Sequence, residues 1–290
     1  MTAKTPSSEL NSAFESYWKL VDDESAAISK GKAELEEIKI RSNESSTVYA
    51  CRFAGVGGYP LFAYYSVPKG KGPFPGLLET PGYGSVRGVP GVERRAKYAV
   101  MAVCHRGQRL SDSGYKSAYP GLMTEGLPDA GSFRWRDIVA DSLRSFDVML
   151  ARPEVDRARI GIAGNDVAAI CAALRPQTKV LLFNGQFLFR DTPRRLDAIS
   201  DYPLQEFNDF KRTHPSQWPK AAETLSLYDP VSFAQKIKAE TLIACLKSDV
   251  APSAPFASAI KGKCETRVNS GYGYLDHESQ EHWLQDRLGA

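Results

Sequence analysis

Five short apolar runs constrain the fold of this chain most strongly. Each run is four to seven residues long and almost continuously hydrophobic, so both faces of the strand that it predicts must be covered by other elements. Helical spacing occurs between the runs, most clearly at residues 136–151. Alternating buried strands and helices indicate an α/β fold with a mainly parallel, doubly wound sheet. The five runs are residues 76–79, 98–104, 160–163, 180–183 and 241–245.

The region before these runs has two other patterns. From residue 9 to residue 38 apolar residues recur at helical spacing, which predicts one or two N-terminal helices. Residues 46–53 and 60–67 are rich in Val, Tyr, Phe and Ala and flank a glycine-rich turn, which predicts an antiparallel hairpin. We therefore expect an N-terminal helical extension over residues 1–40.

A single α/β domain is expected over residues 41–290. One interruption occurs at residues 191–228, where Pro, Trp, Tyr and many charged residues replace the strand and helix alternation. We interpret about 191–230 as a helical insertion over the sheet edge. Its aromatic residues, and those just before it, are expected to pack in the core: Phe187, Phe189, Tyr202 and Trp218.

The composition excludes several classes of function. The 37 Lys and Arg residues and 34 Asp and Glu residues are intermixed, which gives no basic surface for nucleic acid. No apolar stretch is long enough to span a bilayer, and the start of the chain lacks the apolar centre of a signal peptide, so a cytoplasmic protein is expected. The five cysteines contain no CxxC pair, which suggests neither a disulfide framework nor a zinc site. No glycine pattern suits a nucleotide, and no cofactor is expected.

The most informative segment lies where the run at 160–163 meets an alanine-rich helix. It reads Gly164-Asn165-Asp166-Val167-Ala168. In α/β-hydrolases a strand-to-helix turn of this kind has the pattern G-x-S-x-G and exposes a nucleophilic serine. The serine position is occupied here by Asp166, which becomes the first candidate for a catalytic residue.

A series of short motifs surrounds this segment in a fixed order. They are Pro81-Gly82-Tyr83, Arg87-Gly88, Arg106-Gly107-Gln108, Met123-Thr124, Gly126-Leu127, Arg136-Asp137, Ala140-Asp141, Arg152-Pro153-Glu154-Val155-Asp156, Arg159-Ile160-Gly161, Glu223-Thr224-Leu225-Ser226 and Tyr228-Asp229. In order and spacing they resemble the acetyl xylan esterases and cephalosporin C deacetylases of carbohydrate esterase family 7, over roughly residues 59–278. The resemblance implies an α/β-hydrolase fold, a small-molecule substrate and, by analogy, a homo-oligomer of six subunits.

The resemblance also implies the remaining site residues. The family's final Tyr-Gly-His-Glu motif is similar to residues 272–278 and identifies His277 as the general base. The acid is Asp249 or, if the spacing to the following proline is strict, Ser248; we favour Asp249 because it is the only carboxylate there. The backbone amides of Tyr83 and Val167 are the expected oxyanion donors. Supporting roles are expected for Arg106 and Gln108.

An aspartate at the turn weakens ordinary esterase chemistry. A unit negative charge about 4 Å from a developing oxyanion costs about 4 kcal/mol at an effective dielectric constant of about 20. The leading hypothesis is a hydrolase of small esters or related bonds that uses Asp166, His277 and Asp249 in an atypical mechanism. Three alternatives stay open: an Asp-nucleophile hydrolase of epoxides or alkyl halides, a lyase with an Asp or His general base, and a non-catalytic binding or assembly module.

The other histidines have less specific patterns. His282 follows His277 by five residues, off the i+4 spacing of a paired ligand, and is expected on the surface together with His214. His105 adjoins Arg106 at a strand end, where it either lines a pocket or makes a structural hydrogen bond.

Overall fold

A computed structural model describes residues 8–28, 33–84, 87–184, 187–196 and 201–290 of the chain. Residues 1–7, on which part of the signal-peptide argument depends, lie outside this set. Within the described residues the strands form one nine-stranded sheet in the order β1-β2-β3-β5-β4-β6-β7-β8-β9. The strands are β1 (Glu34–Glu37), β2 (Ser46–Ala54), β3 (Pro60–Pro68), β4 (Phe74–Glu79), β5 (Ala99–Cys104), β6 (Val155–Gly164), β7 (Val180–Asn184), β8 (Glu240–Cys245) and β9 (Cys264–Val268).

The sheet is mainly parallel, as the apolar runs predict. The strands β4 to β9 are parallel to one another, and the first three strands extend the sheet in antiparallel fashion. All five predicted runs are strands of this sheet, and the predicted hairpin is the antiparallel pair β2 and β3. Because parallel strands end at the same edge, the segments after β4, β5, β6, β7 and β8 all emerge at the carboxyl edge, where α/β sheets bind ligands.

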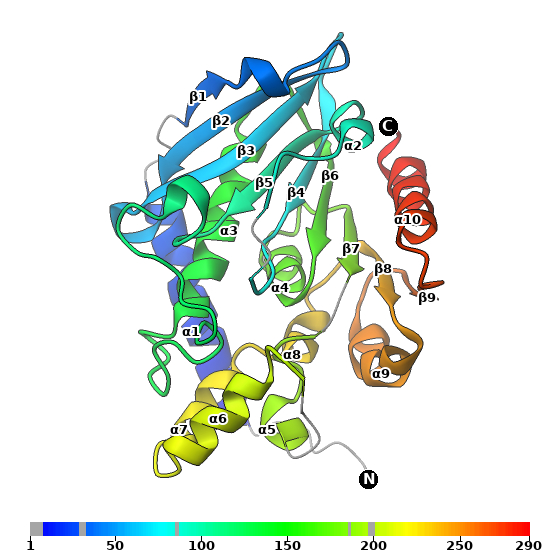
Figure 1. Ribbon diagram of the computed structural model, residues 1–290. Helices are drawn as coiled ribbons and strands as arrows, with labels where there is room; N and C mark the ends of the chain where they lie inside the picture. The colour runs from blue at the N-terminus through cyan, green and yellow to red at the C-terminus, as the bar shows by residue number, and fades with distance from the viewer. Residues whose placement is uncertain (1–7, 29–32, 85–86, 185–186, 197–200) are drawn as a thin grey trace.

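Helices cover both faces of the sheet (Figure 1). The larger hydrophobic core lies under α1, α3, α4, α8 and α9, and a smaller core lies under α10 on the opposite face, where Trp283 and Leu284 pack on the strands. The helices are α1 (Ser8–Ala27), α2 (Val92–Arg95), α3 (Arg134–Leu150), α4 (Asp166–Leu174), α5 (Thr192–Arg195), α6 (Gln205–Thr213), α7 (Trp218–Ser226), α8 (Pro230–Ala234), α9 (Val250–Ala259) and α10 (Gly273–Leu288). Short 3₁₀ turns occur at Lys39–Arg41, Val56–Gly58, Arg109–Ser111 and Lys247–Asp249.

The N-terminal region is only partly as expected. The helix α1 packs on α3, and its Trp18 is buried and donates a hydrogen bond from Nε1 to the carbonyl oxygen of Leu227 at 2.8 Å. The prediction of helix as far as residue 38 is wrong for residues 34–37, which form β1 and pair with β2. Backbone pairing with an open sheet edge outweighs the local helical spacing in this short segment.

The insertion is helical, with α5, α6 and α7 lying below the carboxyl edge of the sheet in Figure 1. Among the described residues, no helix is both long enough and apolar enough to cross a membrane. All five cysteines are free thiols, and four of them are buried.

Candidate functional site

The turn between β6 and α4 differs in one respect from the sequence-based expectation. Gly164 has a φ of +154°, and a Cβ there would lie 2.1 Å from Thr80 Oγ1, so only glycine fits. The residue at the turn itself is Asn165, the N-cap of α4, whereas Asp166 is the first residue of the helix. Asp166 therefore belongs to the helix and follows the residue at the turn.

The carboxylate of Asp166 is fully buried. Its Oδ2 accepts a hydrogen bond from the amide of Leu188 at 2.8 Å, and its Oδ1 accepts one from the amide of Phe189 at 3.3 Å. These two residues follow β7, the strand next to β6. Asp166 thus holds the segment after β7 against the start of α4.

Burial raises the pKa of Asp166 to about 7, although the hydrogen bonds from Leu188 and Phe189 oppose this rise. A carboxyl group with such a pKa carries a proton in about half of the molecules at neutral pH. It can accept a proton from a neighbouring group far better than an ordinary exposed aspartate can.

This pKa predicts a pH-dependent stability. Because the pKa of Asp166 is about 7 in the folded chain and 3.8 without its environment, the folded state binds the proton more tightly. The stabilisation is fully present below about pH 4 and is lost as the pH rises through about 7. Between about pH 4.5 and pH 8 we expect the unfolding free energy of the wild type to fall by about 3 kcal/mol relative to Asp166→Asn. Urea unfolding of both proteins measures this difference, and parallel pH profiles would contradict it.

The other two expected catalytic residues lie apart from Asp166. The side chain of His277 is 55% exposed on α10, and its Nε2 lies 3.9 Å from Glu281 Oε1. Asp249 is half-buried at the N-cap of α9, and its carbonyl oxygen accepts a hydrogen bond from Ser253 Oγ at 2.8 Å. The described structure contains no hydrogen bond or ion pair between any two of Asp166, His277 and Asp249.

His277 instead lines a pocket of about 300 Å³ between α2 and α10. Glu79 and Arg94 also line it, and the Arg94 guanidinium makes ion pairs with both Glu79 and the buried Glu281. A second hollow of about 370 Å³ lies between β9 and α10, and most of its lining residues are polar or charged. His282 is one of them and is exposed, as expected. Neither hollow is lined by Asp166.

The two expected oxyanion donors are both at the carboxyl edge. Val167 is the second residue of α4, and an amide in the first turn of a helix has no acceptor within that helix. Tyr83 follows β4 and is half-buried, and its hydroxyl donates a hydrogen bond to Glu206 of the insertion. Glu206 had no distinguishing pattern in the sequence.

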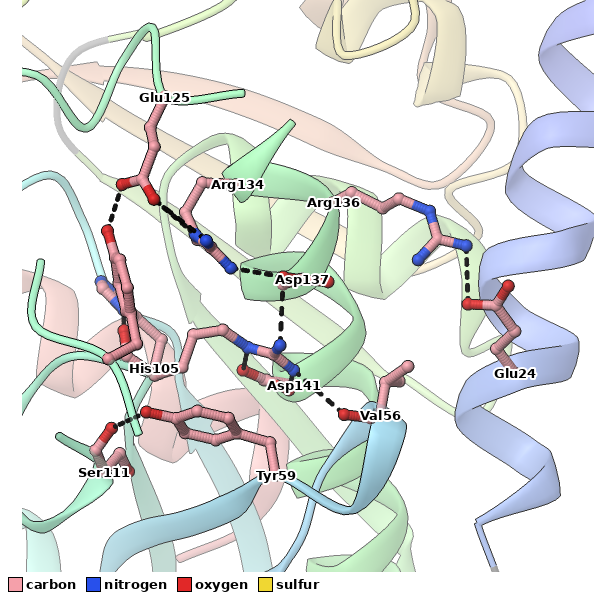
Figure 2. Close-up of polar contacts among 12 residues, drawn as sticks. Glu24, Val56, Tyr59, His105, Ser111, Glu125, Arg134, Arg136, Asp137 and Asp141 are labelled. Atoms are coloured by element: carbon pink, nitrogen blue, oxygen red, sulfur yellow. Dashed lines mark hydrogen bonds and ion pairs between the residues drawn. The ribbon is translucent and has the colours of Figure 1, made fainter. Parts of the chain in front are cut away.

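The supporting residue Arg106 belongs to a polar network with Asp137, Asp141 and Tyr59, and Figure 2 shows how these three partners lie. Its Nε and Nη2 donate to the two carboxylate oxygens of Asp141 at 2.9 and 2.8 Å, and its Nη1 lies 3.0 Å from Asp137 Oδ2. The guanidinium also lies over the ring of Tyr59, 4.7 Å from its centroid. Burial alone would lower the pKa of Arg106, but the hydrogen bonds and charge of Asp141 raise it above its ordinary value. Arg106 therefore joins β5, the loop before β3 and α3.

The neighbours of Arg106 are also buried. Gln108 is 2% exposed, its Nε2 donates to Tyr119 Oη at 3.3 Å, and its Oε1 has no hydrogen-bond partner among the described residues. His105 is fully buried, and its Nδ1 lies 2.7 Å from the carbonyl oxygen of Arg106, which corresponds to the structural alternative for this residue. Desolvation lowers the pKa of His105 to about 4, so the ring is neutral at physiological pH.

A metal is not suggested by the side chains in the described part of the chain. No group of three or more His, Cys, Asp or Glu residues there is arranged to hold a metal ion. The turn itself has a buried carboxyl group, that of Asp166, at the N-terminus of α4.

Comparisons with known proteins agree with this architecture. The chain is 25% identical to an acetyl xylan esterase from Paenibacillus sp. R4, with a TM-score of 0.82 and coverage of 98% of this chain and 100% of the other. It is 26% identical to acetyl xylan esterase 1 from Thermoanaerobacterium sp. JW/SL YS485, with a TM-score of 0.79 and coverage of 98% and 99%.

A curated relative is the acetyl esterase Axe7A of Xylanibacter ruminicola, which is 23% identical over 242 residues and 77% of this chain. The match spans about half of that protein, 53% of its length. Residues 2–289 match the family described as acetyl xylan esterase (AXE1). The chain therefore belongs to the acetyl xylan esterase (AXE1) family and has the α/β-hydrolase fold.

Proposed function

We propose that this chain hydrolyses acyl esters of small hydroxylated molecules, such as acetylated sugars, at the carboxyl edge of the sheet. The family match and the names of the similar proteins support an ester substrate. The observation that carries the proposal is the turn between β6 and α4, where Gly164 precedes the N-terminus of the helix and Asp166 is its first residue. By the resemblance, Asp166 takes the position of the nucleophilic serine. Without a serine at this turn, no seryl acyl-enzyme forms there, and a water molecule attacks the ester directly.

Asp166 is proposed as the general base for that water. A base with a pKa near the working pH is efficient, and Asp166 has a pKa of about 7 because it is buried. A base can also act through one intervening water, whereas a nucleophile must contact the substrate carbon. Since both oxygens of Asp166 are buried and bound to the amides of Leu188 and Phe189, the role of base fits the geometry better than that of nucleophile.

This role also reduces the conflict between Asp166 and an oxyanion. When a water adds to the ester carbonyl, its proton passes to the Asp166 carboxylate and the carbonyl oxygen gains the negative charge. Asp166 is then neutral at the moment when the oxyanion forms, so the repulsion of about 4 kcal/mol expected for two charges about 4 Å apart is removed. The amides of Tyr83 and Val167 are the proposed donors to that oxygen.

The proposal gives no step of the reaction to His277 or Asp249. A joint Asp166, His277 and Asp249 mechanism requires a conformation in which His277 approaches Asp166. In the structure His277 is next to Glu281. The Asp-nucleophile alternative has the same requirement, because a histidine must activate the water that hydrolyses the alkyl ester on Asp166.

A panel of substrates followed by single turnover in ¹⁸O-labelled water tests the proposal. The panel contains acetylated xylose, 4-nitrophenyl acetate, a terminal epoxide and a haloalkane. We expect turnover of the acetyl esters, with the label in the released acetate and none in the peptide that contains Asp166. Label in that peptide, measured by mass spectrometry after epoxide or haloalkane turnover, would support the nucleophile alternative. A folded wild-type protein without activity on any of these compounds would support a binding or assembly role.

A further inference from the structure

One carboxylate of the insertion contacts the loop that follows β4. Glu206 is the second residue of α6 and is 6% exposed. Its Oε1 accepts a hydrogen bond from the Tyr83 hydroxyl, and its Oε2 accepts one from the amide of Met123 at 2.9 Å. Glu206 therefore connects three segments that are far apart in the sequence: the insertion, the loop after β4 and the segment before α3.

Aromatic neighbours fix the side chain of Tyr83 further. Its ring packs edge-to-face with Tyr119, with centroids 5.4 Å apart, and with Tyr202, with centroids 5.2 Å apart. The hydroxyl groups of Tyr83 and Tyr202 are also hydrogen-bonded to each other. The expectation that Tyr202 packs in the core is wrong, because 54% of the residue is exposed. Its ring packs instead against the ring of Tyr83.

The same helix also contacts the segment that holds Asp166. Phe207, directly after Glu206, is fully buried, and its ring lies 6.3 Å from that of Phe189. The amide of Phe189 is one of the two that donate to Asp166. Consecutive residues of α6 thus contact both sides of the proposed site, the Tyr83 loop and the loop beside the turn.

We propose that Glu206 is a positioning residue that fixes the Pro81–Tyr83 loop through the Tyr83 hydroxyl, so that the Tyr83 amide faces the acyl oxygen of the substrate. The inference rests on the proposed ester hydrolysis. It means that a residue of the insertion helps to position one of the oxyanion donors. A carboxylate suits this place because it accepts from an O–H and an N–H at once, whereas a glutamine has only one acceptor oxygen. Glu206→Gln keeps one acceptor oxygen for the Met123 amide and therefore removes the charged acceptor of the Tyr83 hydroxyl.

A double-mutant cycle tests the link. Glu206→Gln and Tyr83→Phe are each expected to lower kcat by about 10-fold with KM changed less than about 2-fold, because an oxyanion donor acts mainly on the transition state. The double variant is expected to be no slower than the slower single variant, since both changes break the same contact. Additive effects on kcat, or an effect on KM alone, would overturn the inference.

A matched control is available at the other end of the sheet. The Tyr65 hydroxyl donates to Glu154 Oε1 at 3.0 Å, and Glu154 directly precedes β6 at the amino edge. Tyr65→Phe removes the same kind of contact and is expected to leave kcat unchanged. A loss of kcat in Tyr65→Phe equal to that in Tyr83→Phe would show a general effect of structure and contradict the assignment.

A second measurement does not require activity. Burial and the hydrogen bonds to Glu206 and Tyr202 raise the pKa of Tyr83 well above its ordinary value. An alkaline titration followed by NMR of ¹³Cζ-labelled tyrosine is expected to show a lower pKa of Tyr83 in Glu206→Gln than in the wild type. If no ester is hydrolysed, the proposed function fails, and this titration still decides the link: a lowered pKa supports it and an unchanged pKa overturns it.

Discussion

Replacing Asp166 with asparagine is expected to lower kcat for acyl ester hydrolysis by about 100- to 10,000-fold, the usual range for loss of a general base. Asparagine has almost the same shape but cannot take a proton from water. The KM is expected to change little because the substrate does not bind through the buried carboxyl group. Steady-state kinetics with acetylated xylose measure both constants.

Asp229 provides the matched control for this substitution. It is half-buried, and its two oxygens accept hydrogen bonds from the amides of Asp191 and Val231, both at 2.9 Å. Asp229→Asn therefore loses a comparable charged acceptor of two backbone amides. Because the charge of Asp229 raises the pKa of Asp166 less than burial does, the kcat of Asp229→Asn is expected to stay within about 3-fold of the wild type. If Asp166→Asn also keeps its kcat within this range, Asp166 is not the base and its function is to hold the segment after β7.

Replacing Arg106 with alanine is expected to reduce the unfolding free energy by about 4 kcal/mol. Asp141 is fully buried and receives two hydrogen bonds from Arg106, so the substitution leaves a carboxylate without its charged partner in the interior. Breaking a buried ion pair in this way costs about 3–5 kcal/mol. Equilibrium unfolding in guanidinium chloride measures the change.

Arg134 serves as the control for Arg106. It also makes ion pairs with two carboxylates, Glu125 and Asp137, and its guanidinium lies 4.2 Å from the centroid of the Tyr115 ring. Its side chain is 22% exposed, against 9% for Arg106, and water screens its ion pairs more strongly. Arg134→Ala is expected to cost about 1 kcal/mol. Equal losses of unfolding free energy in the two variants would mean that the burial of the Arg106 and Asp141 pair does not increase its contribution to stability.

The double variant Arg106→Met, Asp141→Leu separates the effect of leaving Asp141 unpaired from the effect of losing the other contacts of Arg106. It removes both charges and keeps side chains of similar volume, so it is expected to recover more than half of the stability lost in Arg106→Ala. No recovery would mean that the contacts of Arg106 with Tyr59 and Val56 supply most of its effect.

The sequence by itself determined the sheet and the family. Continuous apolar runs predict buried parallel strands because both faces of such strands need cover, and all five runs lie in the sheet. The order of the motifs indicated the family because it depends on many positions at once. The apolar runs and the order of the motifs are properties of the sequence alone, so they predict the sheet and the family without knowledge of the tertiary structure.

Only the tertiary structure decided how the side chains meet. Asp166 binds amides 22 and 23 residues away, Glu206 binds Tyr83 across 123 residues, and His277 is beside Glu281 on a face of α10. Such contacts leave no periodic pattern, because each depends on where a helix begins, how a loop packs and which face a helix presents. The start of α4 is also decided there: Asn165 is the N-cap, and Asp166 is the first residue of the helix with its carboxylate in the interior.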